Sequence, residues 1–248
     1  PFTESLFLFF GILFLIGIHQ SNIKLLLFAM FCMCLSRAAA VFFLPCAIFT
    51  GFLAPKKGEF ADFKFVLYVS ITSILGVLTG ALIQYLDSGV FFSFLAQQNY
   101  WSHGWQLPKL PLTAWNMFRM FWLDSTALLA SFICFLISAY IFFQRVFKRN
   151  TQTDKALVFS LVYIGLFFPY MLFYYGNSVY SLNRYIFASP FIVYLFISLF
   201  KLAPLEDKRL YQLFGGFIIV SIVVWALFGM FPDYYRTAIE NKKYFFYF

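Results

Sequence analysis

The residues of this sequence that are best suited to chemistry are two arginines and one acid set among apolar residues. Arg37 and Arg184 each carry a planar guanidinium, which binds phosphate through paired, charge-assisted hydrogen bonds. Glu4 opens an apolar segment, where a carboxylate can act as a general base, orient one, or complement a helix dipole. These residues predict an anion-binding site in which Glu4 is the candidate catalytic residue.

A purely structural role remains open for each of these residues. Arg184 also suits a cation at the edge of a membrane that only sets the orientation of the chain. Arg37 also suits an ion pair with Glu4 or with Asp124. The residue types alone do not decide between these roles and the binding of an anion.

The segment 88–120 is a second source of candidates, because its aromatic residues alternate with amides. We expect it to lie at the external membrane interface, with the rings in lipid and the amides toward water. An interfacial anchor without any chemistry would have the same composition. Tyr185, next to Arg184, is a further candidate for contact with a substrate. The substrate-binding candidates within the segment are Gln97, Gln98, Trp101 and His103.

No common catalytic or metal-binding motif accompanies these residues. The sequence has no Walker loop, Rossmann glycine pattern, zinc signature or nucleophile elbow. The four cysteines lie in apolar runs, without metal-ligand spacing to either histidine, and we expect them to be small buried hydrophobic residues. The sequence therefore predicts neither a metal nor a resident cofactor.

The composition indicates which elements must position such a site. Of 248 residues, 62% are hydrophobic and 11% are charged, against about 45–50% and about 25% in soluble domains. A soluble protein of this size lacks the interior to bury so much apolar surface, so we predict an integral membrane protein. The net charge of +8 then indicates cytoplasmic loops and contact with anionic lipid, rather than nucleic acid.

Uncharged runs of about 20 residues predict the membrane-spanning helices. Pro169 and Pro190 are expected to kink two of them, and Gly76 and Gly80 form a GxxxG face suited to close helix packing. The predicted spans are Phe65–Leu86, Phe121–Phe143, Ala156–Tyr175, Tyr185–Phe200 and Tyr211–Phe231.

The N-terminal part needs a different arrangement. An apolar segment, Ser5–Ile18, is followed by a polar turn, and Leu25–Leu53 then runs apolar except around Arg37. As one helix this run would be about 44 Å long at ~1.5 Å per residue, against a bilayer core of ~30 Å. Arg37 would also lie near mid-membrane at a cost of several kcal/mol. We therefore predict two short helices that meet at Arg37.

This split also sorts the charges. Eleven basic residues fall on one side and seven on the other, against ten and seven without the split, and the richer side is predicted to be cytoplasmic. The fold prediction is an all-α, polytopic transmembrane bundle of about eight hydrophobic segments, forming one domain over residues 1–248 in a bacterial inner (plasma) membrane. The polar residues predicted at its external face are Glu4, Arg37, Asp87, His103, Arg119, Asp124 and Arg184.

Four short motifs occur in an order that resembles a known family. The first motif opens the first apolar helix, and the second interrupts the second apolar stretch. The third lies in the external segment 88–120, and the fourth precedes Pro190. Together they resemble the GT-C superfamily of polytopic glycosyltransferases, in particular the PIG-V-like mannosyltransferase branch and its bacterial relatives, from Pro1 to about Pro190. The motifs are Thr3–Phe7, Leu35–Arg37, Phe94–Trp101 and Asn183–Tyr185.

The resemblance implies transfer of a sugar from a polyprenyl-phosphate donor to an acceptor on the external or lumenal face. The implied partners are this lipid-linked substrate and membrane lipids, and further membrane subunits stay open. The family's catalytic acid lies in a first external loop that no position here matches. Because the chain opens at Pro1 without an initiator Met, we expect either a portion of a longer polypeptide or a form that lacks the catalytic half.

Two other classes of function stay open. A transporter or lipid flippase would also place paired charges and broken helices near a substrate path, although it would be expected to show internal repeats, and the sequence shows no convincing one. A non-catalytic membrane subunit would use its polar residues for packing alone. An acidic residue in an upstream external loop would favour the transferase.

Overall fold

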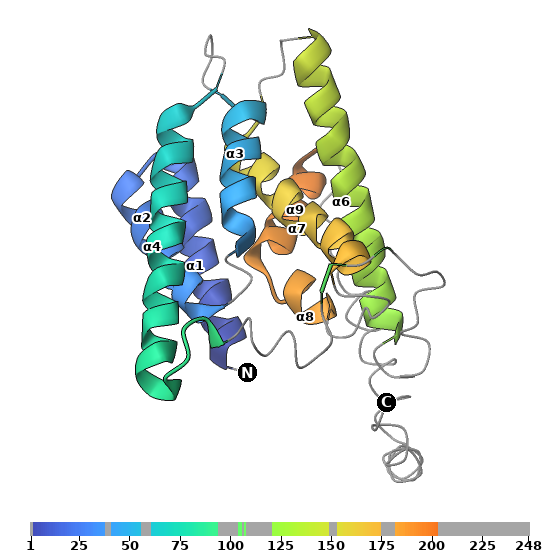
Figure 1. Ribbon diagram of the computed structural model, residues 1–248. Helices are drawn as coiled ribbons and strands as arrows, with labels where there is room; N and C mark the ends of the chain where they lie inside the picture. Colours follow the sequence, from blue (N-terminus) through green and yellow to red (C-terminus); the bar gives the residue numbers. More distant parts are fainter. Residues whose placement is uncertain are drawn as a thin grey trace, which may run out of the picture. The chain divides into compact units, whose positions relative to one another are not determined.

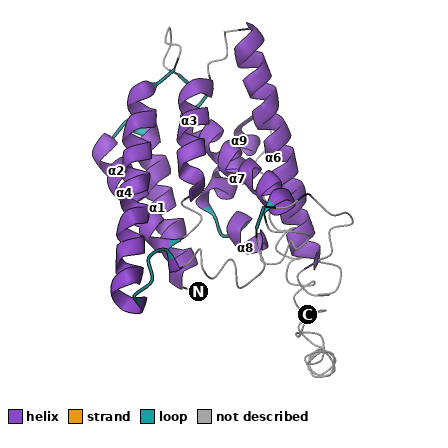
Figure 2. Cartoon of the chain, in the orientation of Figure 1, coloured by secondary structure: helices purple, strands orange, loops and turns teal. Residues whose placement is uncertain are grey.

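The fold is helical throughout the part of the chain that the structure describes. The computed structural model describes residues 2–37, 41–55, 61–93, 104–105, 107, 121–148, 153–174 and 182–202, and all regular secondary structure in these ranges is helical (Figures 1 and 2). The all-α prediction is therefore confirmed. The helices are α1 (Phe2–His19), α2 (Ile23–Ser36), α3 (Phe43–Leu53), α4 (Phe63–Ser88), α6 (Phe121–Lys148), α7 (Lys155–Phe173), α8 (Leu182–Ile186) and α9 (Pro190–Leu202).

Pro1–Ser198 forms one compact unit, and a second unit begins at Leu199. Residues 203–248 lie outside the described residues, and with them the predicted span Tyr211–Phe231. Most of the segment 88–120 lies outside them as well. The assignment of residues 1–248 to a single transmembrane domain stays a prediction.

Among the residues that the structure describes, three helices are long and apolar enough to cross a membrane: α4, the Thr126–Phe147 part of α6, and α7. α4 begins before its predicted run, where Asp62 caps it, and α6 continues beyond Phe143, whereas α7 ends at Phe173, before the predicted Tyr175. On α4, Leu67, Ile71 and Leu78 lie on an exposed apolar surface. Such a surface suits lipid contact. The full number of membrane crossings stays a prediction.

The predicted break at Arg37 is confirmed. α2 ends at Ser36, whose hydroxyl donates to the carbonyl oxygen of Met33 at 2.8 Å, and Arg37 has extended backbone angles. α3 begins six residues later, and Pro45 falls in its first turn, where its missing N–H removes no helical hydrogen bond. With 14 and 11 residues, α2 and α3 are about 21 and 17 Å long at ~1.5 Å per residue, shorter than a bilayer core.

The predicted span Tyr185–Phe200 is wrong in detail, because two helices replace it. α8 ends at Ile186, and Pro190 is the first residue of α9 rather than a kink inside a longer helix. Proline suits this position, where the missing N–H is an orphan in any case. The hydroxyl of Ser189 accepts the N–H of Phe191 at 3.2 Å in place of a helical bond. Pro169, by contrast, does lie inside α7.

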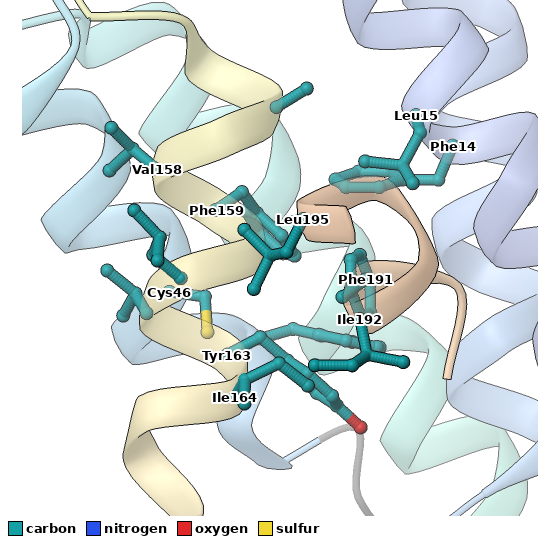
Figure 3. Packing of buried hydrophobic residues seen from close by; sticks show 14 of the residues in the cluster. Phe14, Leu15, Cys46, Val158, Phe159, Tyr163, Ile164, Phe191, Ile192 and Leu195 are labelled. Carbon is teal, nitrogen blue, oxygen red and sulfur yellow. The ribbon is translucent and has the colours of Figure 1, made fainter. Parts of the chain in front are cut away.

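Aromatic rings from four helices form the centre of the core (Figure 3). Phe191 of α9 lies 4.5 Å from Tyr163 and 5.4 Å from Phe159, both on α7, measured between ring centroids. Phe14 of α1 lies 4.8 Å from Phe159, and Phe43 of α3 lies 5.5 Å from Tyr163. Each such pair adds about 0.5–1.5 kcal/mol beyond its buried area. This cluster holds α1, α3 and α9 against α7.

Small residues let helix backbones approach closely at two contacts. A Cβ added to Gly76 of α4 would lie 2.5 Å from the Cβ of Cys34 on α2, so half of the predicted GxxxG face is a packing surface. The other half is not, since an added Cβ at Gly80 meets nothing within 4 Å. Gly165 of α7 faces α6, where an added Cβ would lie 2.9 Å from the backbone nitrogen of Phe135.

Charged residues join the helix ends that lie opposite the break at Arg37. The carboxylate of Asp62 caps α4 and is buried against Lys155 at the start of α7. Asp154 caps α7 and accepts the hydroxyl of Tyr194 from α9. Each cap satisfies backbone N–H groups that a helix start leaves without partners, so α4, α7 and α9 are tied together at this end.

The contact between α6 and α7 leads to a first prediction. Gly165→Ala should lower the melting temperature by several degrees, because the neighbouring Phe135 atoms are backbone and cannot move aside as a side chain can. Gly80→Ala is the matched control, since open space surrounds it and alanine improves helix propensity by about 1 kcal/mol. Thermal unfolding in detergent measures both. A Gly165→Ala protein as stable as wild type would contradict this packing.

Candidate functional site

Three charged side chains from three separate elements meet at the helix ends around the break between α2 and α3. Glu4 comes from the first turn of α1, Arg37 follows the last residue of α2, and Arg184 lies on α8. The guanidinium of Arg184 forms an ion pair with Oε1 of Glu4, and Nη2 of Arg37 lies 3.9 Å from the same oxygen. The structure thus brings together the three residues that the sequence singled out first.

Arg37 is the inner member of this cluster, with its side chain only 10% exposed. Its Nη1 donates to the backbone carbonyl of Arg184 at 3.1 Å. Its guanidinium carbon lies 4.5 Å from the ring centroid of Tyr185 and 5.7 Å from that of Phe7, which places the cation against two aromatic faces. Arg37 therefore holds α8 against the end of α2, and its proximity to Glu4 agrees with the ion-pair alternative.

Arg184 is the outer member, with its side chain 56% exposed. A guanidinium carries five N–H donors in a planar fork, and the Glu4 carboxylate faces only one edge of it. The exposure leaves donors of Arg184 accessible to a ligand. The difference in exposure distinguishes the two arginines as candidate ligand-binding residues, whereas the sequence alone did not distinguish them.

Asp124 of α6 positions the short helix that carries Arg184. It is buried, and its Oδ1 accepts the backbone N–H of Asn183 in the first turn of α8 at 2.8 Å. A carboxylate at this point satisfies an otherwise unpaired N–H and favours the positive end of the helix. The sequence placed Asp124 at this face, and the structure shows that it contacts the backbone beside Arg184.

The environment of Glu4 keeps its carboxylate ionised. Hydrogen bonds from its own backbone N–H and from Arg184 lower its pKa from 4.5 to about 2, against the opposing effect of burial, and the charge of Arg184 adds to the shift. A carboxylate with so low a pKa is a weak proton acceptor near neutral pH. In this state Glu4 is suited to partnering the arginines, and its role as a base stays a prediction.

A stripe of aromatic residues on α7 leads away from this cluster. Phe167 lies 5.6 Å from Tyr185, and Tyr170 follows one turn later along α7. The ring of Tyr174, 5.2 Å from Tyr170, closes the stripe at the end of the helix. The exposed ring of Trp105 lies 5.9 Å from Tyr174, and the N–H of Gly104 donates to the carbonyl of Tyr174 at 3.0 Å. One point of the segment 88–120 is thereby placed beside the stripe.

The four other substrate-binding candidates, Gln97, Gln98, Trp101 and His103, lie outside the described residues, so their roles stay predictions. Sequence reasoning did not single out the aromatic stripe. Its signal was present, because positions 163, 167, 170 and 174 follow the i, i+4, i+7, i+11 spacing of one helix face. In a chain with 39 Phe and 16 Tyr, such spacing is easily taken for ordinary packing.

Within the described ranges, no three His, Cys, Asp or Glu side chains gather as metal ligands. The four cysteines are free thiols, three of them buried and Cys32 partly so. Comparison of the chain with protein-family models, with curated proteins and with solved structures gives no match.

The low pKa of Glu4 predicts a specific pH dependence. Because folding lowers this pKa, the stabilisation by Glu4 is complete above its ordinary value of 4.5 and is lost as the pH falls toward about 2. The difference in unfolding free energy between wild type and Glu4→Gln should therefore be constant above about pH 5 and shrink below it. Denaturant unfolding of both proteins over this range measures it. A difference that instead grows as the pH falls would contradict the assigned pairing.

Proposed function

We propose that this protein is an integral membrane glycosyltransferase that uses a polyprenyl-phosphate-linked sugar as donor. The observation that carries the proposal is the exposed guanidinium of Arg184, held in place by Glu4, Arg37 and Asp124 at one end of an apolar bundle. The order of the short motifs, which resembles the GT-C superfamily, supports the class of enzyme. Mannose is the sugar that this resemblance suggests.

The chemistry of transfer explains why such a donor needs a fixed cation. The acceptor hydroxyl attacks the anomeric carbon of the sugar and loses its proton to a base, while the bond between that carbon and the phosphate oxygen breaks. The polyprenyl phosphate leaves, so negative charge develops on its oxygens. A preorganised guanidinium stabilises this charge where it develops. Arg184 is suited to that role, whereas the catalytic acid that the resemblance implies lies in a first external loop that no position here matches.

The surroundings of the cluster suit the rest of such a donor. The half-buried rings of Tyr170 and Tyr174 on α7 are of the kind that stack on sugars. The exposed apolar surfaces of α4 and α6 suit the prenyl chain and membrane lipid. The charge distribution favours the external face of a bacterial inner membrane as the location of the site.

A lipid transporter is the second candidate, and the two helix breaks favour it. Transporters place discontinuous helices and paired charges beside the substrate path, and here α2–α3 and α8–α9 are both interrupted next to the arginines. Proteoliposomes loaded with a polyprenyl-phosphate sugar separate the two functions. Transfer to an acceptor on one face, without movement of the lipid between leaflets, supports the transferase, whereas movement without transfer overturns it.

Arg184 gives the sharpest test of the proposed donor site. Arg184→Lys keeps the charge but loses the planar fork, and it should impair transfer substantially. Arg184→Ala should weaken donor binding by about 2–4 kcal/mol. The measurement is binding and turnover of a short-chain polyprenyl-phosphate mannose by the full chain in detergent.

Arg145→Lys is the matched control, because it makes the same exchange near the far end of α6. It should leave donor binding unchanged. A cation that only sets topology would tolerate lysine equally well, since lysine also obeys the positive-inside rule. Wild-type binding and turnover in Arg184→Lys would therefore remove Arg184 from the donor site.

The segment 88–120 gives a further prediction, which rests on its sequence. Amides hydrogen-bond sugar hydroxyls and aromatic rings stack on sugar faces, so Gln98 and Trp101 are expected to border the substrate. The double change Gln98→Ala with Trp101→Ala should reduce transfer far more than it reduces thermal stability. Full activity in this double variant would leave the segment as an interfacial anchor only.

A further inference from the structure

The side chain of Tyr163 poses a problem at the centre of the core. The residue is fully buried on α7, and its hydroxyl has no hydrogen-bond partner among the described residues. A buried hydroxyl without a partner costs about 1–3 kcal/mol. Phenylalanine would fill the same space without this cost, and it is the commonest aromatic residue of the chain.

Four phenylalanine rings surround the ring of Tyr163. Phe191 lies 4.5 Å away, Phe167 5.4 Å, Phe43 5.5 Å and Phe7 6.2 Å, measured between centroids. None of these side chains has an acceptor atom. Figure 3 shows the hydroxyl at the far tip of the ring, pointing away from α7 beyond Ile192.

Five other buried hydroxyls without partners differ from Tyr163 in one respect. Each belongs to a serine or threonine on a helix, where a small rotation brings the hydroxyl to the carbonyl one turn earlier. A tyrosine hydroxyl lies too far from its own backbone to do so, and its acceptor must come from elsewhere. The five residues are Thr50, Ser70, Ser131, Ser138 and Ser160.

Two routes of ring contacts link Tyr163 to Arg37. The ring of Phe7 contacts both Tyr163 and the guanidinium of Arg37. Phe167 contacts both Tyr163 and Tyr185, and Tyr185 covers the other face of Arg37. Tyr163 therefore carries a fully buried hydroxyl on a ring that shares its neighbours with Arg37.

We propose that Tyr163 is a ligand-binding residue of this site, whose hydroxyl donates a hydrogen bond to a phosphate oxygen of a lipid-linked ligand bound at Arg37. The inference rests on the proposed donor site and deepens it. The guanidinium of Arg37 has only hydrogen-bond donors, so a ligand group that bonds to both Arg37 and a donating hydroxyl must be a hydrogen-bond acceptor. In a polyprenyl-phosphate sugar, the strongest acceptor is a phosphate oxygen. Because Tyr163 is inaccessible in this state, binding displaces the half-buried ring of Tyr185 from Arg37.

Tyr163→Phe tests the inference, because it removes the hydroxyl and keeps the ring. The probe is a short-chain polyprenyl phosphate without sugar, added to the full chain in detergent. Its affinity should fall about ten-fold or more, as expected for the loss of a charge-assisted hydrogen bond. Without the probe, the melting temperature should be unchanged or higher, since an orphan hydroxyl has been removed. Ser160→Ala, which removes a buried hydroxyl one turn away on α7, should leave the affinity unchanged.

The outcomes separate this inference from the proposed function. If wild type binds the probe and Tyr163→Phe binds it equally well, the role of Tyr163 is overturned while the donor site stands. If wild type does not bind the probe, both are overturned. A clearly lower melting temperature of Tyr163→Phe without the probe would show that the hydroxyl has a partner within the protein, which also overturns the inference. Inorganic phosphate is the second arm, and binding of it as tightly as of the lipid would overturn the lipid-linked assignment.

Discussion

The arrangement around Glu4 depends on one constraint, which is that a charge in an apolar bundle needs a partner. A single carboxylate lies beside two guanidinium groups, those of Arg37 and Arg184. Removing one member leaves a charge without its partner, which is most unfavourable for Arg37, because its side chain is only 10% exposed. The start of α1, the end of α2 and the whole of α8 are therefore held at one point, although little else in their apolar sequences would select that register.

The position of this charged cluster determines where the neighbouring helices end. Arg37 cannot continue α2 into lipid, so the chain leaves the helix in an extended conformation and starts α3 only at Phe43. α8 is likewise too short to be stable by itself, and it is fixed by Asp124 at its first turn and by Arg37 at the carbonyl of Arg184. Two backbone polar groups of α8, the N–H of Asn183 and the carbonyl of Arg184, thus lie beside charged side chains that satisfy them.

The parts of the fold that the sequence predicted are those that depend on length and charge. α4 and α7 follow from uncharged runs of spanning length, and the break at Arg37 follows from the cost of an arginine in lipid. The break before α9 was missed because Pro190 lies within a run that stays apolar. The meeting of Glu4, Arg37 and Arg184 could be predicted as far as their shared face. The sequence offered an ion pair of Arg37 with Glu4 as one of two alternatives, but it did not offer the pair of Arg184 with Glu4. The place of Tyr163 in the core could not be predicted, because α7 is apolar on every side and its pattern does not show which face meets α1 and α9.

The two arginines differ in how easily a ligand can reach their guanidinium groups. Arg37, 10% exposed, has its guanidinium committed to a backbone carbonyl and two rings, so a ligand reaches it only after Tyr185 moves. Arg184 is 56% exposed, and its ion pair with Glu4 is the contact that a ligand would replace. An incoming phosphate competes with Glu4 for Arg184 at little desolvation cost, whereas Arg37 gains an anion only by losing its cation–π contact. A ligand held by both would therefore be captured first by the outer arginine, and the inner one would contribute only when the aromatic cover has opened. The Glu4 carboxylate released from Arg184 in this exchange would keep Arg37 as a neighbour, whose Nη2 lies 3.9 Å from it.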